Sequence, residues 1–149
     1  MKSRFEDYVK HLLLLDDDNS IEFVCGGGTY FRRPGSNGGE GIEVVNAGAV
    51  VTAVREFFQL VDVLSKKYWA YGGEWRIGLH VNNLRGKPIS FNDLTRRGST
   101  FATDTVTSQI VTSPASWDDG VDGVARKLLA GFLRAIGRET WSLDRAAAR

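Results

Sequence analysis

The chain has 149 residues, of which 42% are hydrophobic and 25% charged, and its formal net charge is +1. This composition predicts one globular domain over residues 1–149 that folds without a disulfide or a metal, and it argues against a strongly basic nucleic-acid binder. No run approaches the roughly 20 apolar residues of a membrane span, and the single cysteine favours a reducing compartment. We therefore expect a cytoplasmic protein with no membrane partner.

The first third of the chain predicts a helix, two strands and a loop. Helical spacing of apolar residues predicts an amphipathic helix over residues 3–15. Alternation over residues 20–25 predicts a strand that places Cys25 on the apolar side, so an inert core thiol is favoured over a nucleophile. Residues 29–33 are extended again and are expected to pair back on this strand, and the breaker-rich segment 34–41 predicts a glycine-rich loop.

The middle of the chain predicts a long helix followed by a strand. Asn46 is a suitable N-cap for a helix over residues 47–69, which carries a broad apolar stripe. Strict alternation over residues 74–82 then predicts a half-buried strand with Trp75, Ile77, Leu79 and Val81 on one face. The chain is expected to turn near residues 83–87 and to return through residues 89–91 as the antiparallel partner of this strand.

The last third predicts a strand and a helix. Residues 100–112 are rich in β-branched residues, which favour a strand. Ser116 or Asp118 is expected to cap a helix that ends at Gly137, and the tail over residues 138–149 is expected to fray. The order of elements predicts an α+β fold in two layers, with an antiparallel or mixed sheet covered by helices on one face.

The sequence contains no recognisable catalytic or metal-binding motif. The glycines between residues 26 and 41 match neither the phosphate loop nor the dinucleotide-binding pattern. Two histidines and one cysteine have no zinc-ligand spacing, and the acidic clusters at 16–18 and 118–122 are explained more simply as solvated helix ends. We therefore predict no catalytic residue, no metal and no cofactor, although a carboxylate pair formed only in three dimensions would leave no sequence signature.

One face of the strand over residues 74–82 is the candidate binding surface. Period two places Arg76, His80 and Asn82 on the polar face around Gly78, which leaves a hollow. Guanidinium and imidazole groups beside such a hollow suit an anionic ligand. Four further basic residues, beside the glycine-rich loop and in the turn after the strand, are expected to contribute: Arg32, Arg33, Arg85 and Lys87.

Two segments resemble bacterial proteins that carry a Schlafen-related, AlbA-type DNA-binding domain. Thr29-Tyr-Phe-Arg-Arg-Pro-Gly-Ser-Asn37 is similar to the aromatic-Arg-x-Gly-Ser segment at the end of that domain, and Trp75-Arg-Ile-Gly-Leu-His-Val-Asn-Asn-Leu-Arg-Gly86 resembles the region that follows it. The chain is too short before Tyr30 to hold the complete domain, so DNA binding is not carried over. The resemblance implies an accessory region with a role in sensing, regulation or assembly.

These observations predict a non-enzymatic binding or regulatory module that engages a protein, a nucleic acid or an anionic ligand through its polar strand face and glycine-rich loop. Two alternatives remain open. A structural subunit would expose a large apolar patch and form a homo-oligomer. A small enzyme would join His80 to a carboxylate of perturbed pKa in one pocket.

Overall fold

The computed structural model of the protein describes residues 11–15, 20–25, 28–32, 41–91 and 94–138. In chain order its elements are β1 (His11–Leu15), β2 (Ile21–Cys25), β3 (Thr29–Arg32), β4 (Ile42–Asn46), α1 (Ala47–Val63), a π-helical turn (Leu64–Tyr68), β5 (Trp75–Val81), β6 (Pro88–Phe91), β7 (Leu94–Thr100), β8 (Val106–Thr112), a 3-10 turn (Pro114–Ser116) and α2 (Gly120–Ala135). This mixture of helices and strands is an α+β fold, as the sequence predicts.

The described strands form three small sheets. β3, β4, β6 and β7 lie in that order in a mixed sheet, in which β4 and β6 are parallel and the other neighbours are antiparallel. β1 pairs with β2, and β5 pairs with β8 in an uninterrupted antiparallel register. Within the described part of the chain, β2 and β5 therefore have one ladder partner each.

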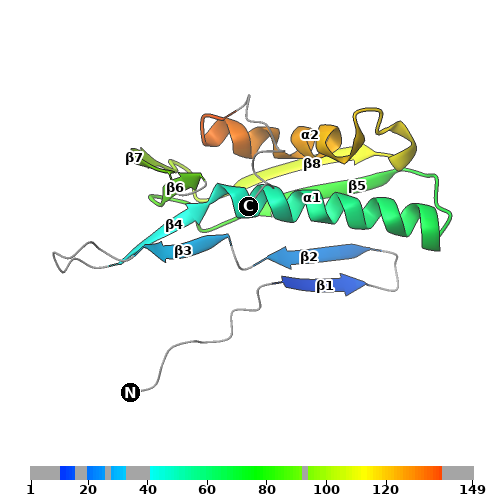
Figure 1. Ribbon diagram of the computed structural model, residues 1–149, viewed down its shortest axis with the longest axis horizontal. Coiled ribbons are helices and arrows are strands. Elements are labelled where there is room, and N and C mark those ends of the chain that lie inside the picture. Colours follow the sequence, from blue (N-terminus) through cyan, green and yellow to red (C-terminus); the bar gives the residue numbers. More distant parts are fainter. Residues whose placement is uncertain (1–10, 16–19, 26–27, 33–40, 92–93, 139–149) are drawn as a thin grey trace, which may run out of the picture.

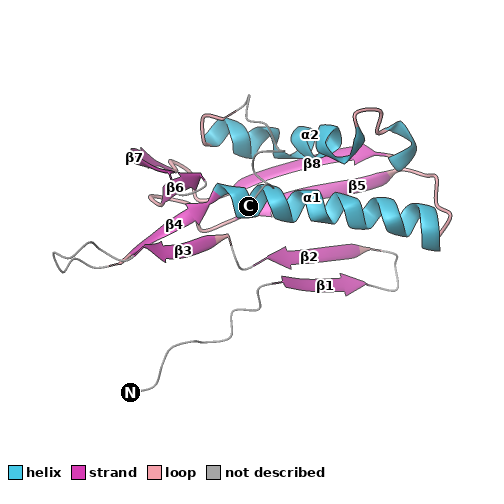
Figure 2. Ribbon diagram, in the orientation of Figure 1, coloured by secondary structure: helices cyan, strands magenta, loops and turns pink. Residues whose placement is uncertain are grey.

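The helices cover one face of the sheet formed by β5 and β8. α2 packs along β8 and beside α1, and β5 and β2 lie on either side of α1 (Figures 1 and 2). Exposed and less exposed side chains alternate along β5 and β8, so the face toward the helices is apolar. The shared core contains Val51, Phe58 and Val61 of α1, Leu128, Leu129 and Phe132 of α2, Ile77 of β5 and Ile89 of β6.

α1 begins where its sequence predicts. The side-chain oxygen of Asn46 accepts a hydrogen bond from the backbone N–H of Ala49 at 3.1 Å, which satisfies a donor left open at the helix start. The backbone N–H of Asn46 donates to the Gly28 carbonyl at 2.7 Å, and the same residue pairs with β6. β4 therefore passes into α1 without a loop. The predicted helix is confirmed, except that its last turn is π-helical.

The helix predicted over residues 3–15 is wrong for the part that is described. Residues His11–Leu15 form β1, which pairs residue for residue with β2. Leu13 and Leu14 are 43% and 39% exposed, so neither belongs to a deeply buried helical stripe. A run of leucines fits either structure, and the long-range partner β2 supplies the backbone hydrogen bonds here. Residues 3–10 lie outside the described residues.

The hairpin predicted between residues 74–82 and 89–91 is also wrong. β5 is confirmed as a strand, but β6 pairs with β4 and β7 instead of β5. The turn between them holds Asn83 and Gly86 at φ of 59° and 72°, and Leu84 in this turn is 1% exposed. Because Leu84 is buried in the core, the chain leaves the line of β5, and β8 becomes its partner. For the same long-range reason β3 pairs with β4 and not with β2.

The strand predicted over residues 100–112 is confirmed only for its second half, which is β8, and its first residue, Thr100, is the last residue of β7. β7 ends at Thr100, and β8 begins at Val106. Phe101 in the break is 3% exposed, and its backbone N–H donates to the Lys87 carbonyl at 3.2 Å. Burial of this aromatic side chain interrupts the extended chain between β7 and β8, and the β-branched residues that favour a strand are concentrated in β8.

The final helix ends as predicted but starts later. Gly137 has a φ of 67°, and its N–H donates to the Arg134 carbonyl at 3.0 Å, as expected of a glycine that ends a helix. Ser116 and Asp118 do not cap α2, which begins after Asp119 without a side-chain cap bond. Ser116 belongs instead to the preceding 3-10 turn.

Candidate binding site

Three aromatic side chains pack together where α1 gives way to β5. Trp69 stacks on Trp75 with ring centroids 5.9 Å apart and planes at 27°, and Tyr71 meets the same indole edge-on at 5.5 Å and 82°. Pairs of this kind each contribute about 0.5–1.5 kcal/mol beyond the burial of area. Trp69 and Tyr71 nevertheless remain 43% and 44% exposed. We call Trp69, Tyr71 and Trp75 the aromatic triad.

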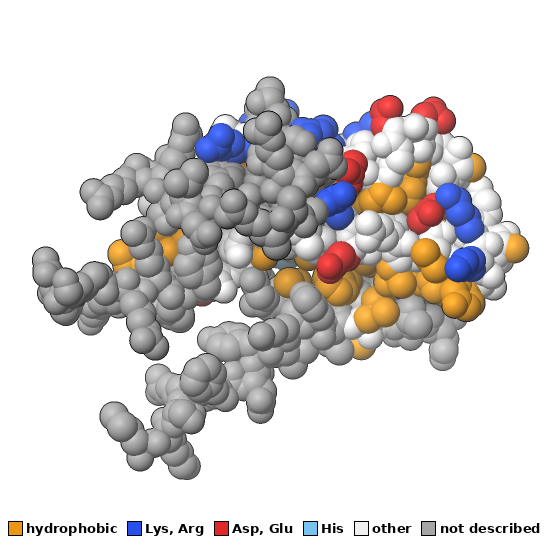
Figure 3. Space-filling model, in the orientation of Figure 1, with side chains coloured by type: hydrophobic (Ala, Val, Ile, Leu, Met, Phe, Trp, Pro, Cys, Tyr) orange, Lys and Arg blue, Asp and Glu red, His pale blue; other side chains and the backbone are white. Residues whose placement is uncertain are grey.

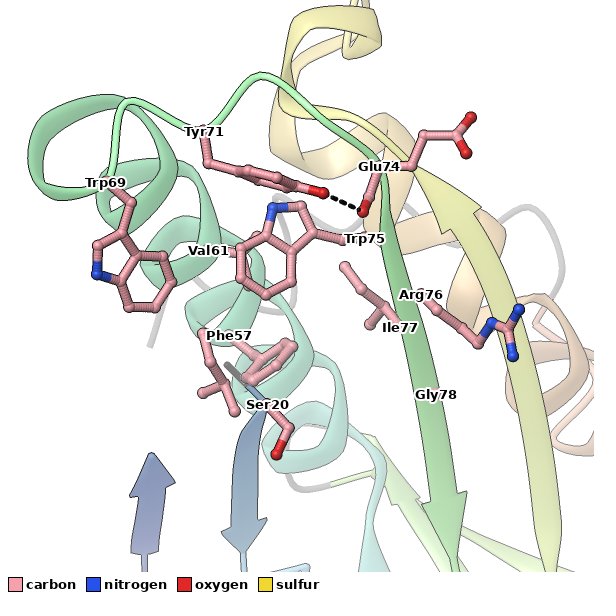
Figure 4. Close-up of a pocket in the computed structure, with 11 residues that line it drawn as sticks. Ser20, Phe57, Val61, Trp69, Tyr71, Glu74, Trp75, Arg76, Ile77 and Gly78 are labelled. Carbon is pink, nitrogen blue, oxygen red and sulfur yellow. Dashed lines mark hydrogen bonds between the residues drawn. The ribbon is translucent and has the colours of Figure 1, made fainter. Parts of the chain in front are cut away.

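Hydrogen bonds hold Tyr71 and Trp75 of the aromatic triad in place, and Trp69 stacks on Trp75. The indole N–H of Trp75 donates to the hydroxyl of Ser65 at 3.0 Å, and Ser65 is only 1% exposed. The Tyr71 hydroxyl donates to the Glu74 carbonyl at 3.0 Å, drawn as a dashed line in Figure 4. The backbone N–H of Tyr71 donates to the Ser65 carbonyl at 2.9 Å. The rings are therefore set before a ligand arrives, which lowers the entropy lost on binding.

Position 73 must be glycine for the Tyr71 ring to lie where it does. A Cβ at Gly73 would collide with this ring and would lie 2.8 Å from its Cε2 atom. At the neighbouring Gly72 a Cβ would meet nothing within 4 Å. Alanine at position 73 would therefore displace the Tyr71 side chain, whereas alanine at position 72 would leave it in place.

The aromatic triad forms one end of a cavity of about 570 Å³. Phe57 and Val61 of α1 line its base, Ser20 and Ile21 lie on one side, and the five residues from Glu74 to Gly78 lie on the other (Figure 4). This volume falls within the range of about 300–1,000 Å³ that is usual for ligand pockets. The mixture of aromatic walls and a few polar groups is also typical of such pockets.

The surface around the cavity exposes further apolar side chains. Tyr68 is 72% exposed and Val63 is 43% exposed. Figure 3 shows hydrophobic side chains gathered toward the right of the view, over the end of α1, with charged side chains beside them. Lys66 and Asp62 form an ion pair at 2.7 Å in this segment. Contiguous exposed apolar groups with a polar rim mark interaction surfaces.

The polar face predicted for β5 is present and open. Arg76, Gly78 and His80 are exposed, and their partners across the ladder are the exposed residues Val111, Gln109 and Thr107. His80 Nδ1 lies 3.0 Å from Thr107 Oγ1. Asn82 is exposed just beyond the end of β5. Arg76 also lines the cavity and forms no ion pair with any described residue, so it joins the polar face to the cavity.

The two basic residues predicted after β5 have different surroundings. Arg85 is exposed, whereas the Lys87 side chain is 13% exposed and forms an ion pair with Glu43 at 3.1 Å. Burial alone would raise the pKa of the Glu43 carboxyl, but hydrogen bonds from Thr29 and Lys87, with the Lys87 charge, outweigh it and hold the pKa below its usual value. Lys87 therefore joins its own turn to β4 and is not part of the β5 face.

The remaining predicted site residues lie at or beyond the edge of the described chain. Arg32 is the last residue of β3, and its side chain, Arg33 and residues 34–40 lie outside the described parts. Cys25 is half-buried on the side of β2 predicted for it, and it does not line the cavity. Among the described residues, no three His, Cys, Asp or Glu side chains gather as metal ligands would.

The cavity is not among the features predicted from the sequence, although a cluster of aromatic residues in the sequence indicates it. Four aromatic residues fall within the eight positions from Tyr68 to Trp75, around Gly72 and Gly73. Tryptophans at the ends of elements predict core or rim packing, and Trp117 confirms this by packing edge-on against Phe58 at 5.4 Å. In the segment from Tyr68 to Trp75, Gly72 and Gly73 instead indicate an exposed turn, where so many aromatic rings are unusual.

Comparison with known proteins identifies no relative. No protein-family model, curated protein or solved structure matches the chain significantly. The resemblance to Schlafen-related proteins therefore stays a prediction. None of the helices in the described ranges has both the length and the apolar character needed to cross a membrane.

Proposed function

We propose that the protein is a non-enzymatic binding module that recognises a protein partner through the cavity beside the aromatic triad. The observation that supports this most is that Trp69 and Tyr71 stay more than two-fifths exposed while stacking and hydrogen bonds fix their positions. Tryptophan and tyrosine are enriched among the residues that dominate protein–protein binding energy. A preset aromatic site favours an apolar side chain inserted from a partner.

Arg76 supports a preference for a partner with an acidic group. Arg76 lines the cavity from β5, and Figure 4 shows its guanidinium extended over the neighbouring strand β8 and away from the aromatic triad. No carboxylate of a described residue pairs with it. Arginine binds carboxylates through two parallel hydrogen bonds, which add strength and direction. A partner that places a carboxylate next to an apolar side chain would use both parts of the site. The anion preference predicted for the β5 face is thus retained, with the cavity beside it as the apolar part of the site.

A nucleic-acid partner and an enzymatic role have less support. Of the basic residues predicted for the site whose side chains are described, Lys87 is paired with Glu43, and Arg76 and Arg85 are exposed. Nucleic-acid affinity depends on several phosphate contacts. The described partner of His80 is a hydroxyl and not a carboxylate. A cytoplasmic location stays part of the proposal, because a single cysteine suits a reducing compartment.

Peptide selection tests the proposed function. A displayed random-peptide library is selected on the immobilised full-length protein, and enriched peptides are titrated by calorimetry. We expect enriched sequences to combine an aromatic or aliphatic residue with Asp or Glu. Their affinity should fall about tenfold or more, or about 1.4 kcal/mol, in Trp69→Ala and Gly73→Ala. Gly72→Ala is the matched control and should bind as the wild type does.

Three outcomes would overturn the proposal. The library yields no enriched peptide, or the enriched peptides bind Trp69→Ala and Gly73→Ala with unchanged affinity. In the third outcome, a mixed nucleic-acid pool binds at physiological salt and displaces the peptides, which would favour phosphate recognition. Circular dichroism of each variant checks that lost affinity does not come from lost folding.

A further inference from the structure

The cavity adjoins the edge of β5 and not one of its faces. The five residues from Glu74 to Gly78 all line it, although Trp75 and Ile77 face the core while Arg76 and Gly78 are exposed on the opposite side. A space that touches both sets of side chains lies beside the backbone that joins them. β8 is the single ladder partner of β5 among the described strands, so the main-chain N–H and C=O groups on this edge belong to no ladder within the described part of the chain.

A second strand begins on the other side of the cavity. Ser20 and Ile21 line it there, and β2 continues from them with β1 as its described partner. β2 rests on α1 through Phe23, whose ring centroid lies 6.3 Å from that of Phe57. Figures 1 and 4 show β2 and β5 on either side of α1, running in the same direction. The opening therefore has strand backbone on both sides and α1 beneath it.

We infer that an extended segment of the partner binds in this opening as an added β-strand, paired to β5 by main-chain hydrogen bonds. This inference rests on the proposed function and names the form in which the partner is bound. Strand addition to an exposed sheet edge is a recurring mode of peptide recognition, in which backbone bonds give affinity and alternate side chains give specificity.

β5 has the features that strand addition needs. It is seven residues long, contains no proline and keeps an unbroken register with β8. Edge strands that resist addition are usually short, bulged or interrupted by proline.

Alternation along the added strand specifies the partner's side chains. Those directed toward α1 meet Phe57, Val61 and the aromatic triad, so they are apolar. Those directed away from α1 lie beside Arg76, so an acidic residue is favoured there. Figure 4 shows the Glu74 carboxylate and the Arg76 guanidinium both turned away from the cavity, and they point in different directions. The segment that fits best has apolar residues at alternate positions and an acidic residue beside Arg76.

N-methylation of a selected peptide tests strand addition with the full-length protein. Each N-methyl group removes one main-chain N–H and leaves the side chains in place. Alternate N–H groups of a strand point to the same side, so methylation at alternate positions should weaken binding about tenfold or more. Amides of β5 should also become more protected from hydrogen exchange when the peptide binds. Weakening at every position would equally support the inference, since β2 would then pair with the other side of the peptide.

The contrary outcomes separate the inference from the proposed function. Peptides that lose affinity for Gly73→Ala but tolerate N-methylation at every position would overturn strand addition and leave the proposed function in place. Peptides whose affinity changes neither in Gly73→Ala nor on N-methylation would overturn both strand addition and the proposed function. Light scattering supplies the last outcome: a dimer whose β5 amides are protected without peptide, and which peptide does not dissociate, would replace the partner segment by a second copy of the chain.

Discussion

The two ends of α1 use their side chains in opposite ways. At the start, the Asn46 side chain caps the helix, and Glu43 just before it pairs with Lys87. After the last turn, Trp69 and Tyr71 are 43% and 44% exposed beside a cavity. A basic residue in a turn is therefore a weak sign of a binding site, because a carboxylate of the same fold can pair with it. Aromatic rings that stay exposed in a hydrogen-bonded turn are a stronger sign.

The largest effect on the free energy of unfolding is expected from a substitution in the core between the two ends of α1. Phe58 lies between them, is fully buried, and packs edge-on against Trp117 at 5.4 Å. Phe58→Ala should lower the free energy of unfolding by about 3–5 kcal/mol, because it removes an aromatic side chain and leaves a cavity. Urea denaturation measures this loss. Gln59→Ala, at the next and exposed position, is the control and should change stability by less than about 0.5 kcal/mol. Equal stability of the two variants would show that no single core supports both ends.

A smaller effect should be confined to the C-terminal end of α1, beside the cavity. Ser65→Ala removes the acceptor for the Trp75 indole N–H, and an unpaired buried donor costs about 1–3 kcal/mol. We expect a loss of about 2 kcal/mol in unfolding free energy and a changed near-ultraviolet circular dichroism spectrum, since the aromatic triad loses its fixed geometry. Thr103→Ala, at an exposed position, should change neither quantity. An unchanged spectrum in Ser65→Ala would mean that stacking alone positions the rings.

The smallest effect is expected at the N-terminal end of α1 and depends on pH. The pKa of Glu43 is held below its ordinary value of 4.5 in the folded protein, so its ionised form stabilises the fold above that pH. This contribution is lost as the pH falls through the lower folded pKa. Glu43→Gln should therefore lower the free energy of unfolding by about 1 kcal/mol at pH 7, and its difference from the wild type should shrink in acid. Glu56→Gln, exposed on α1, should match the wild type at pH 7. A difference that stays constant into acid would contradict the role of the Glu43 charge.

Local signals in the sequence predict α1, α2 and the two faces of β5, but they wrongly predict a helix at His11–Leu15, which forms β1. Asn46 and Gly137 act within one turn of the chain, and the two faces of β5 follow from its own alternation. Pairing partners depend on distant residues. β5 pairs with β8 because Leu84 is buried in the core, and no periodicity within residues 74–91 contains that information.

In the candidate site too, local sequence patterns predict one part and long-range packing decides the other. Arg76 and His80 share an exposed face, as period two predicts. The cavity brings Ser20 and Ile21 to the edge of β5, and residues so far apart in sequence meet only after both strands have packed on α1. The aromatic residues of the turn can be read from the sequence, but their arrangement involves the hydrogen bonds of Trp75 to Ser65 and of Tyr71 to Glu74, which the sequence does not show.

The direct passage from β4 into α1 limits how the length of this region can vary. Asn46 belongs to the strand ladder and to the helix cap at once, so no residue between the two elements can absorb an insertion. An α-helix turns by about 100° per residue. One residue added or removed at this junction would therefore rotate Phe58 away from the core and Phe57 away from the cavity. Substitutions can be accommodated here, whereas changes of length belong elsewhere in the chain.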